Sequence, residues 1–547
     1  MPPTSRGGDK QRGRGRKLFL EDSTFQRHYD AMAKNRIKYA AVLTMLQRTG
    51  TEISHASKVH ALAAAWAHSD NELANSLLGH NSNEFGLVEV LKAATLLDTS
   101  RRIREWERKL KRLQMHPKKL PRKQNQAVGK IKSVIKNLTS NKPKAGSLSG
   151  AVVRRIKRWM TSVATRDLEF FALHMPKEPW QKLADLVHFN PCKDFPSVPW
   201  FLPYCYGKSA PYDSTVYNCS NLSERNVNNL LRLYDIPYAH VKRFKQVLTE
   251  ESKELISGKE KLDTVLWYYE DLSCPAVDAV IMHRIMAGEP VNLPYGKLME
   301  RLLIIKVMRE EMMATQKKTI AEFYQILLPI AEHRLSEINV TIDAPVVVIG
   351  DRSQSMSVAV QTSTIIASLL CAISKAELCF FNRSNHTPPH LPRTVEEALH
   401  LATTMTAVGG TAPAASLYPY YQAKKVVKTF IVVTDEEEND PLMINHMAKY
   451  FDDVFEKYHR EVYPAKLVFV SFLKQQHSTG KMVRKLQARG FRPIQFRLDE
   501  QRPDLLKLNK LLGLLSMESQ DFNANVQAIE AEIRDEGLKQ AMEKLVV

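Results

Sequence analysis

The stretch VVVIGDRSQSM, residues 346–356, decides the fold of the C-terminal part of the chain. Four consecutive β-branched residues are typical of a strand that is buried on both faces, as in a parallel sheet. An Asp-x-Ser-x-Ser pattern follows directly, and a long apolar helical pattern runs on from Val360 to Ile373. This order predicts a strand–turn–helix unit of a doubly wound α/β domain, with a polar site where the strand ends.

Further elements continue the alternation. Apolar runs at residues 378–381 and 429–433 predict two more strands, and a helical segment beginning at Thr394 lies between them. The second run ends at Thr434-Asp435, and a Gly-Gly-Thr loop at residues 409–411 comes before it. Because ligand sites in such sheets lie at the carboxyl ends of the strands, we expect these polar groups to meet.

The expected site is built from side-chain oxygens, which suit a hard cation such as Mg²⁺ better than Zn²⁺. The alternation in Asp-x-Ser-x-Ser lets one tight turn aim three side chains at a common point, and two glycines allow the threonine loop to approach closely. The alternative is a capping aspartate with ordinary turn serines. The candidate metal ligands are Asp351, Ser353, Ser355, Thr411 and Asp435.

This pattern resembles the metal-ion-dependent adhesion site of von Willebrand factor A-type domains, in which Asp-x-Ser-x-Ser is followed by a Thr and then an Asp. All five positions match. The resemblance implies Mg²⁺ or another hard divalent cation, with a coordination position open for a partner's carboxylate, and hence partner binding rather than catalysis. We expect the acidic run at residues 436–438 to form a solvated loop, with an influence on metal affinity as the alternative.

Positive charge is concentrated in one block. The whole chain has a net charge of +19 and a pI near 9.4, which favours a polyanionic partner. Residues 101–158 carry twenty Lys and Arg against two Glu, a net charge of +18. Apolar residues recur there at helical spacing, so the block at 101–160 predicts amphipathic helices with Lys and Arg on their outer faces.

Such a basic face is the expected footprint of nucleic-acid binding. The alternatives are a solvated helical surface, a targeting signal or a site for an anionic membrane. The candidate RNA-binding residues, chosen from charge and helical facing, are Lys130, Lys132, Lys136, Arg154, Arg155, Lys157 and Arg158.

Three parts of the chain are expected. Residues 1–22 form a disordered basic tail, residues 23–340 an all-α domain and residues 341–547 the α/β domain. Successive helical patterns without strands suggest a HEAT-like solenoid in the all-α domain. The aromatic stretch at 188–217 is expected to be an ordered loop over a satellite core, with base stacking as the alternative.

A helical domain followed by a von Willebrand A domain resembles the TROVE-domain proteins, the Ro ribonucleoprotein autoantigens. The segments that carry the likeness are Thr165 to His174, Asp235 to Tyr238, and the run from Gly409 to Glu437. The resemblance implies a ring of HEAT-like helices closed by the A domain, and binding of small noncoding RNAs and of single-stranded RNA ends.

The sequence therefore predicts a non-catalytic RNA-binding protein of the Ro type. It contains no H-E-x-x-H motif, phosphate loop or nucleophile elbow, so no enzyme is expected, although a nuclease built from scattered acids stays open. The main rival is a metal-dependent protein-interaction adaptor. We expect a soluble cytoplasmic protein, with an additional nuclear location left open. We also expect no membrane partner and six reduced, mostly buried cysteines.

Overall fold

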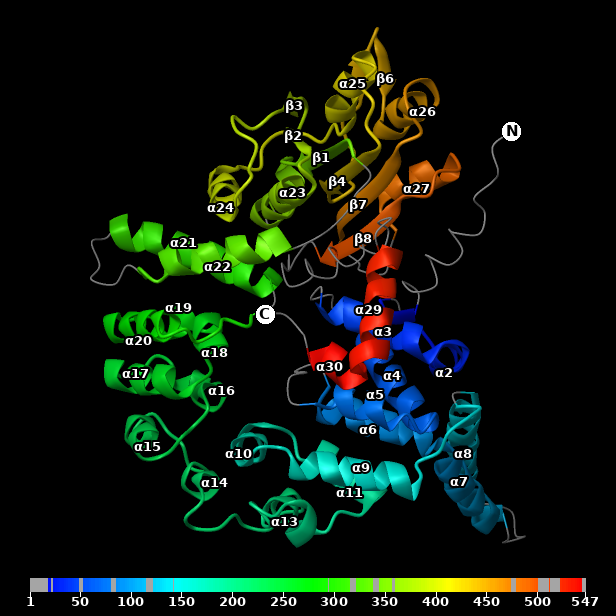
Figure 1. Ribbon diagram of the computed structural model, residues 1–547, viewed down its shortest axis with the longest axis vertical. Coiled ribbons are helices and arrows are strands. Elements are labelled where there is room, and N and C mark those ends of the chain that lie inside the picture. Colours follow the sequence, from blue (N-terminus) through cyan, green and yellow to red (C-terminus); the bar gives the residue numbers. More distant parts are fainter. Residues whose placement is uncertain are drawn as a thin grey trace. The chain divides into compact units, whose positions relative to one another are not determined.

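Helices form all regular structure up to residue 337 in the part of the chain described here, and a mostly parallel sheet begins at Val346. An all-α region followed by an α/β region confirms the expected fold class (Figure 1). The structure is a computed structural model. It describes residues 18–20, 23–48, 53–79, 85–114, 122–140, 142–293, 295–314, 321–337, 344–356, 360–473, 479–499, 511 and 522–543.

The chain divides into two compact units. The first contains Met1–Arg48, Ile53–Lys259 and Asn525–Val547, and the second contains Thr49–Glu52 and Glu260–Ala524. This division does not follow the expected boundary between residues 340 and 341. The last helices before the sheet group with the sheet, and the C-terminal helices group with the N-terminal ones.

The first unit consists of helices. They are α2 (Phe25–Lys34), α3 (Arg36–Arg48), α4 (His55–Ala67), α5 (Asn71–Leu77), α6 (Leu87–Leu97), α7 (Thr99–Gln114), α8 (Arg122–Ser140), α9 (Gly150–Thr161), α10 (Thr165–His174), α11 (Glu178–Val187), α12 (Pro191–Asp194), α13 (Phe201–Cys205), α14 (Thr215–Asn218), α15 (Val227–Leu233), α16 (Tyr238–Val241), α17 (Glu250–Lys259), α29 (Phe522–Glu536) and α30 (Leu538–Glu543).

Small side chains bring the central helices of this unit together. Residues Ala61 to Ala65 of α4 are fully buried, and α4 packs against both α2 and α6. The C-terminal helices are fastened by Arg48, which pairs with Glu532 at 2.8 Å and donates to the Ala541 carbonyl at 2.7 Å. The unit therefore combines helices from both ends of the chain.

The expected tail ends earlier than residue 22. Phe19 and Leu20 are buried, and the Phe19 ring packs against His28 and Tyr39. These apolar residues belong to the core because a short helical turn carries them onto α2 and α3. Residues 1–17 of the tail lie outside the described part of the chain.

The second unit surrounds the sheet. Its helices are α18 (Leu262–Trp267), α19 (Tyr269–Leu272), α20 (Pro275–Met286), α21 (Tyr295–Ala314), α22 (Tyr324–Glu337), α23 (Val360–Ser374), α24 (Val395–Thr404), α25 (Ala414–Gln422), α26 (Phe451–Glu461) and α27 (Lys481–Ala488). Its strands are β1 (Val346–Asp351), β2 (Glu377–Phe381), β3 (Asn385–His386), β4 (Thr429–Thr434), β5 (Leu442–Ile444), β6 (Met447–Lys449), β7 (Lys466–Leu473) and β8 (Ile494–Asp499).

The main sheet has six strands in the order β3-β2-β1-β4-β7-β8, with β3 antiparallel at the edge and the others parallel. Strands β5 and β6 form a separate hairpin. Chain order runs outward from β1 in both directions, so the strand order switches between β1 and β4. Open α/β sheets form their ligand crevice at such a switch point.

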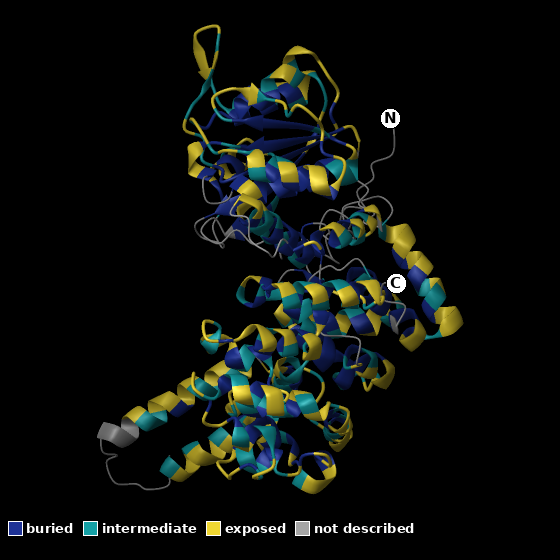
Figure 2. Cartoon of the chain, turned by 90° about the vertical axis from the view of Figure 1, so that its left-hand side faces the viewer, coloured by how far each residue is buried: buried dark blue, intermediate teal, exposed yellow. Residues whose placement is uncertain are grey.

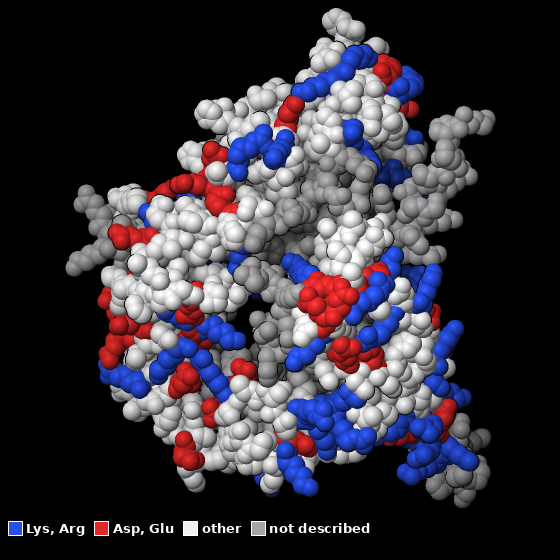
Figure 3. Space-filling model, in the orientation of Figure 1, with Lys and Arg blue, Asp and Glu red and all other residues white. Residues whose placement is uncertain are grey.

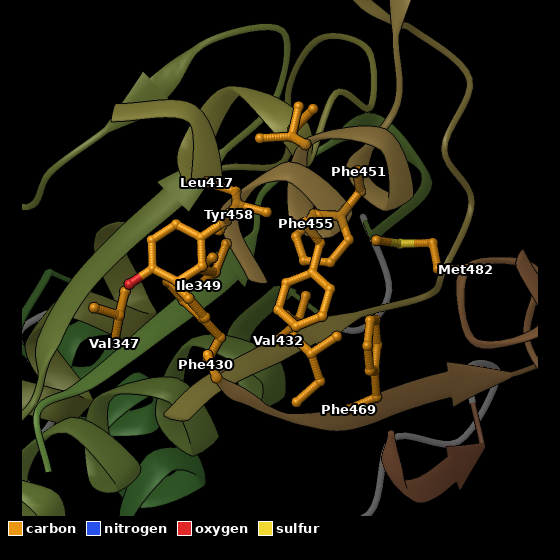
Figure 4. Packing of buried hydrophobic residues seen from close by; sticks show 14 of the residues in the cluster. Val347, Ile349, Leu417, Phe430, Val432, Phe451, Phe455, Tyr458, Phe469 and Met482 are labelled. Carbon is orange, nitrogen blue, oxygen red and sulfur yellow. The ribbon is translucent and has the colours of Figure 1, made fainter. Parts of the chain in front are cut away.

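Helices cover both faces of the sheet, which is why the inner strands β1, β2, β4 and β7 are almost wholly buried (Figure 2). On one face, side chains of α25, α26 and α27 pack on alternate residues of β1, β4 and β7 (Figure 4). The cluster includes Ile349, Phe430, Val432, Phe455 and Phe469, each no more than 1% exposed. Helices α23 and α24 pack together, and α23 lies against β1, β2 and β4.

Candidate metal centre and nucleic-acid interface

Strand β1 delivers Asp351 to the carboxyl end of the sheet. Every residue of the strand is buried, and Asp351 itself is 0% exposed. The chain then turns back on the carboxylate, because the backbone N–H of Ser353 donates to Asp351 Oδ1 at 2.9 Å. The Oγ atoms of Ser353 and Ser355 lie 3.0 Å apart. The turn thus brings all three polar groups of the Asp-x-Ser-x-Ser pattern together.

The neighbouring strand β4 ends beside this turn. Gly350 pairs with Val433 in the parallel register, so the next residue, Thr434, stands next to Asp351. Thr434 Oγ1 donates to Asp351 Oδ2 at 2.7 Å. Asp435 follows, is 4% exposed, and accepts a hydrogen bond from the Glu437 N–H at 2.9 Å.

Hydrogen bonds join the loop that carries Thr411 to the turn after β1 and to the segment after β4. Val408 N–H donates to the Arg352 carbonyl at 2.8 Å, and Gln354 N–H donates to the Gly409 carbonyl at 3.0 Å. On the other side, the carbonyl of Thr411 accepts from the N–H groups of Asn439 and Asp440. Gly409 has a φ of +83°, which an L side chain rarely adopts. The structure therefore gathers all three segments of predicted ligands at one edge of the sheet.

Electrostatics at this edge favour a cation. Burial raises the pKa of Asp351 above its usual range, and the nearby carboxylate of Asp435 raises this pKa further. Two buried carboxylates that repel each other are relieved when a positive ion lies between them. Among the described residues no cluster of three or more His, Cys, Asp and Glu could hold a metal, so a cation at this edge would also need hydroxyl oxygens such as those of Ser353 and Ser355, which lie beside Asp351. These donors fit a hard divalent cation.

The acidic run after Asp435 is not the solvated loop that we expected. Glu436 is 1% exposed, and the side chain of Glu438 is 2% exposed. Glu437 pairs with Lys481, and Glu438 pairs with Lys485 at 3.2 Å and accepts from the Phe451 N–H at 2.6 Å. The prediction was wrong because the partners of these acids, the lysines of α27 and the first N–H of α26, lie far away in the sequence. A run of three acids considered alone gives no sign of them.

Sequence analysis placed Thr434 at the end of its strand and Glu436 in an acidic loop, but it did not identify the contacts of either residue at this edge. Neither belongs to the five-residue pattern, yet Thr434 bonds a predicted ligand and Glu436 follows one directly. The position of Thr434, immediately before the strand-terminal Asp435, was the available signal.

The basic block forms helices α7, α8 and α9, of which α7 and α8 lie side by side. Lys and Arg gather over these helices toward the lower right of Figure 3. Ile103, Ile131 and Ile156 are buried beneath them, as the apolar stripes predicted. Exposed residues on α8 and α9 include Lys130, Lys132, Lys136, Arg154 and Arg158, and Arg155 is half-buried.

Most of these cations have no carboxylate partner. Among the residues that the structure describes, no Asp or Glu lies within ion-pair distance of Lys130, Lys132, Lys136, Arg154, Arg155 or Arg158. Lys157 differs, because its Nζ lies 3.3 Å from Asp194 and donates to the His188 carbonyl at 2.7 Å. Lys157 therefore joins α9 to the last residue of α12 and to His188, which precedes that helix. Lys118 and Lys119 lie outside the described residues.

Only part of the aromatic stretch at 188–217 belongs to the core. Phe195 and Phe201 are buried with Trp180, and their rings contact one another. The stretch contains three short helices rather than a continuous loop. Tyr212 is 80% exposed and its ring packs edge-on against Tyr217 at 4.6 Å, so this pair is accessible for stacking.

Two of the segments that carry the Ro likeness meet in the first unit. Arg166 of α10 pairs with Asp235 at 3.2 Å, and the rings of His174 and His240 lie 6.0 Å apart. Phe170 stacks on His174 at 5.4 Å. Helix α10 thus contacts the segment that begins at Asp235 through both an ion pair and aromatic rings.

These observations define a class: a helical unit with a basic surface, and a parallel α/β unit with an oxygen-rich site at its strand-order switch point. The chain is similar to the crystal structure of the Ro (RSR) protein of Deinococcus radiodurans, with 12% sequence identity and a TM-score of 0.41. The match covers 82% of this chain and 93% of that one. No family model matches the sequence, and no curated protein does.

Two further observations concern the described residues as a whole. None of their helices combines the length and apolar character needed to cross a bilayer. All six cysteines are free thiols; Cys192 is exposed and the other five are buried, which agrees with the expectation of mostly buried thiols.

Proposed function

We propose that the chain is a non-catalytic RNA-binding protein whose α/β unit holds a divalent cation. The observation that carries the RNA part is the set of six cations on α8 and α9 without carboxylate partners. Positive side chains that neutralise no acid of their own chain repel one another, and a phosphate backbone removes that repulsion while releasing its counterions.

The proposed RNA is a small noncoding RNA or one with a single-stranded end. Lys and Arg of α8 and α9 would contact phosphates without reading sequence, because base edges in RNA helices are poorly accessible. Unpaired bases would stack on exposed rings such as Tyr212 and Tyr217. Recognition would thus depend on RNA shape and exposed ends rather than on a base code.

The experiment is a salt titration of RNA affinity. A fluorescein-labelled RNA hairpin with a single-stranded 3′ tail is titrated with the intact chain from low to high salt. We expect the logarithm of affinity to fall linearly with the logarithm of salt, with a slope of about −0.7 to −0.9 per phosphate contact. An affinity that does not change with salt would contradict the basic interface.

The metal part is supported by the contacts among Asp351, Ser353 and Ser355, by the nearby charge of Asp435, and by the backbone hydrogen bonds that hold the loop of Thr411 beside them. Their oxygens would hold Mg²⁺ or a similar hard cation, which would supply an open coordination position for a partner's carboxylate. This same observation favours the second candidate function, a metal-dependent protein-interaction adaptor. Crosslinking followed by RNA recovery separates the two, because an adaptor would recover RNA at background level.

A further inference from the structure

The acidic run that follows Asp435 reaches a single helix, α27. Glu437 and Glu438 pair with Lys481 and Lys485 on its surface, whereas Glu436 is inserted beneath its first turn. The Glu436 carboxylate accepts the Val483 N–H at 3.0 Å. A carboxylate at this place satisfies a backbone donor that the helix itself leaves open and interacts favourably with the helix dipole.

The remaining donors to Glu436 come from two strands. Ser471 of β7 donates its hydroxyl to Glu436 Oε1, and the side-chain amide of Gln495 on β8 donates to the same oxygen at 2.5 Å. The buried charge is therefore held by three donors from three elements. Such a network fixes the side chain in one place, because each lost hydrogen bond would leave a buried polar atom unsatisfied.

Glu436 is also linked to the predicted metal ligands. Its N–H donates to Thr434 Oγ1 at 3.0 Å, and that hydroxyl donates to Asp351. Glu436 adopts a φ of +61°, a left-handed conformation that is costly for a residue with a side chain and that persists only where its surroundings enforce it. The conformation of Glu436 sets the direction in which the chain leaves Asp435.

Gly480 makes room for this carboxylate. It caps the N-terminus of α27, and a Cβ at this position would lie 2.0 Å from the Glu436 carboxyl carbon. Any side chain at residue 480 would therefore push the carboxylate away from α27. This gives a way to displace Glu436 without changing the residue itself.

We propose that Glu436 is a positioning residue for the metal centre and couples its occupancy to helix α27. The proposal rests on the proposed cation site. Asp351 and Asp435 are joined to Glu436 through Thr434 and through the backbone, so a cation that draws the two carboxylates together also fixes Glu436 against α27. By linkage, the coupling is reciprocal. If the bound cation favours the docked position of Glu436 by a given factor, releasing Glu436 from α27 lowers the affinity for the cation by the same factor.

The first test measures Mg²⁺ affinity of the intact chain by calorimetry. Residues that orient metal ligands typically change affinity about tenfold to hundredfold when they are replaced. We expect losses of this size in both Glu436→Ala and Gly480→Ala, and a smaller loss in Glu436→Gln, which keeps one acceptor oxygen. Gly258→Ala is the matched control, because a Cβ there meets no atom within 4 Å.

The second test follows hydrogen exchange at the Val483 amide in the unaltered chain, with and without Mg²⁺. The proposal predicts slower exchange with Mg²⁺, and loss of this effect in Gly480→Ala at Mg²⁺ concentrations that saturate it. A mere loss of stability would raise exchange equally in both conditions. The comparison with and without Mg²⁺ in the unaltered chain does not depend on how well any variant folds.

Either of two results would overturn the positioning role alone. One is unchanged Mg²⁺ affinity in both Glu436→Ala and Gly480→Ala. The other is a Val483 exchange rate in the unaltered chain that is the same with and without Mg²⁺. Failure of the unaltered chain to bind Mg²⁺ would instead remove the metal centre itself, and the positioning role with it.

Discussion

Thr434 Oγ1 donates a 2.7 Å hydrogen bond to Oδ2 of Asp351, across the ends of the adjacent parallel strands β4 and β1. The same hydroxyl accepts the N–H of Glu436 at 3.0 Å. Thr434 therefore joins the first predicted ligand to the segment that contains the last one, Asp435, at the point where the strand order switches.

Replacing Thr434 by Val should destabilise the chain and weaken Mg²⁺ binding. The substitution keeps the shape but leaves a buried carboxylate oxygen and a buried N–H without this partner, at a cost of about 1–3 kcal/mol. Denaturant unfolding and Mg²⁺ calorimetry measure both effects. Thr434→Ser, which keeps the hydroxyl, should have nearly the unfolding free energy and Mg²⁺ affinity of the unaltered chain. Equal values for the Ser and Val variants would argue against the hydrogen bond.

Reversing three charges on α8 should weaken RNA binding. The variant Lys130→Glu/Lys132→Glu/Lys136→Glu removes up to three phosphate contacts, so the salt slope should decrease by about one unit per lost contact. The control, Lys375→Glu/Lys428→Glu/Lys457→Glu, changes the net charge equally on exposed lysines of the second unit. If both variants lose the same affinity, the effect comes from overall charge and not from the basic helices.

Lys157 should behave as a structural residue rather than as an RNA contact. Lys157→Ala removes the ion pair with Asp194, which is 8% exposed, and the hydrogen bond to the His188 carbonyl. The expected loss is about 1–3 kcal/mol of unfolding free energy. Lys136 is exposed and has no acidic partner among the described residues. Lys136→Ala should therefore leave the unfolding free energy unchanged and lower the affinity for RNA. Similar stabilities of the two variants would refute this assignment.

Mild acid should destabilise the chain through His28. Burial, together with the nearby His60, lowers the pKa of His28 from 6.5 to about 3. The unfolded chain takes up a proton below pH 6.5 that the folded chain does not bind until about pH 3. Stability therefore falls as the pH drops through this window, by up to about 1.4 kcal/mol per pH unit.

The check is the slope of unfolding free energy against pH between 6 and 4. His28→Gln cannot take up this proton, so its slope should be shallower by up to one proton, even though the variant starts from a lower stability. An identical slope would mean that His28 is not the titrating group.

The order of elements could be predicted well where periodicity is strong. The helical pattern expected from Val360 to Ile373 corresponds to α23 within one residue at each end, and the helical segment expected from Thr394 corresponds to α24, which begins at Val395. The strand of residues 346–349 continues to Asp351, because the chain stays extended up to the predicted ligand. The later strands β7 and β8 were not predicted, although the run LVFVSFL at 467–473 has the composition of a buried strand.

The sequence indicated which segments meet at this edge of the sheet, but it did not indicate which other residues hold them there. Asp351 and Thr411 are sixty residues apart in the sequence, so no local pattern shows that their segments meet. That expectation came from the topology of parallel sheets, in which ligand sites lie at the carboxyl ends of the strands. The burial of Glu436 and Glu438 depends on partners in α27, more than forty positions further along the chain. Long-range pairing of this kind leaves no trace in the local sequence.

Calorimetric titration of the intact chain with MgCl₂, compared with Asp351→Asn, tests the central claim most directly. Asp351→Asn keeps the size of the side chain and removes the charge that a hard cation requires. The account predicts one Mg²⁺ bound per chain and no measurable binding in Asp351→Asn. Equal binding by the two proteins, or none by the unaltered chain, would contradict it.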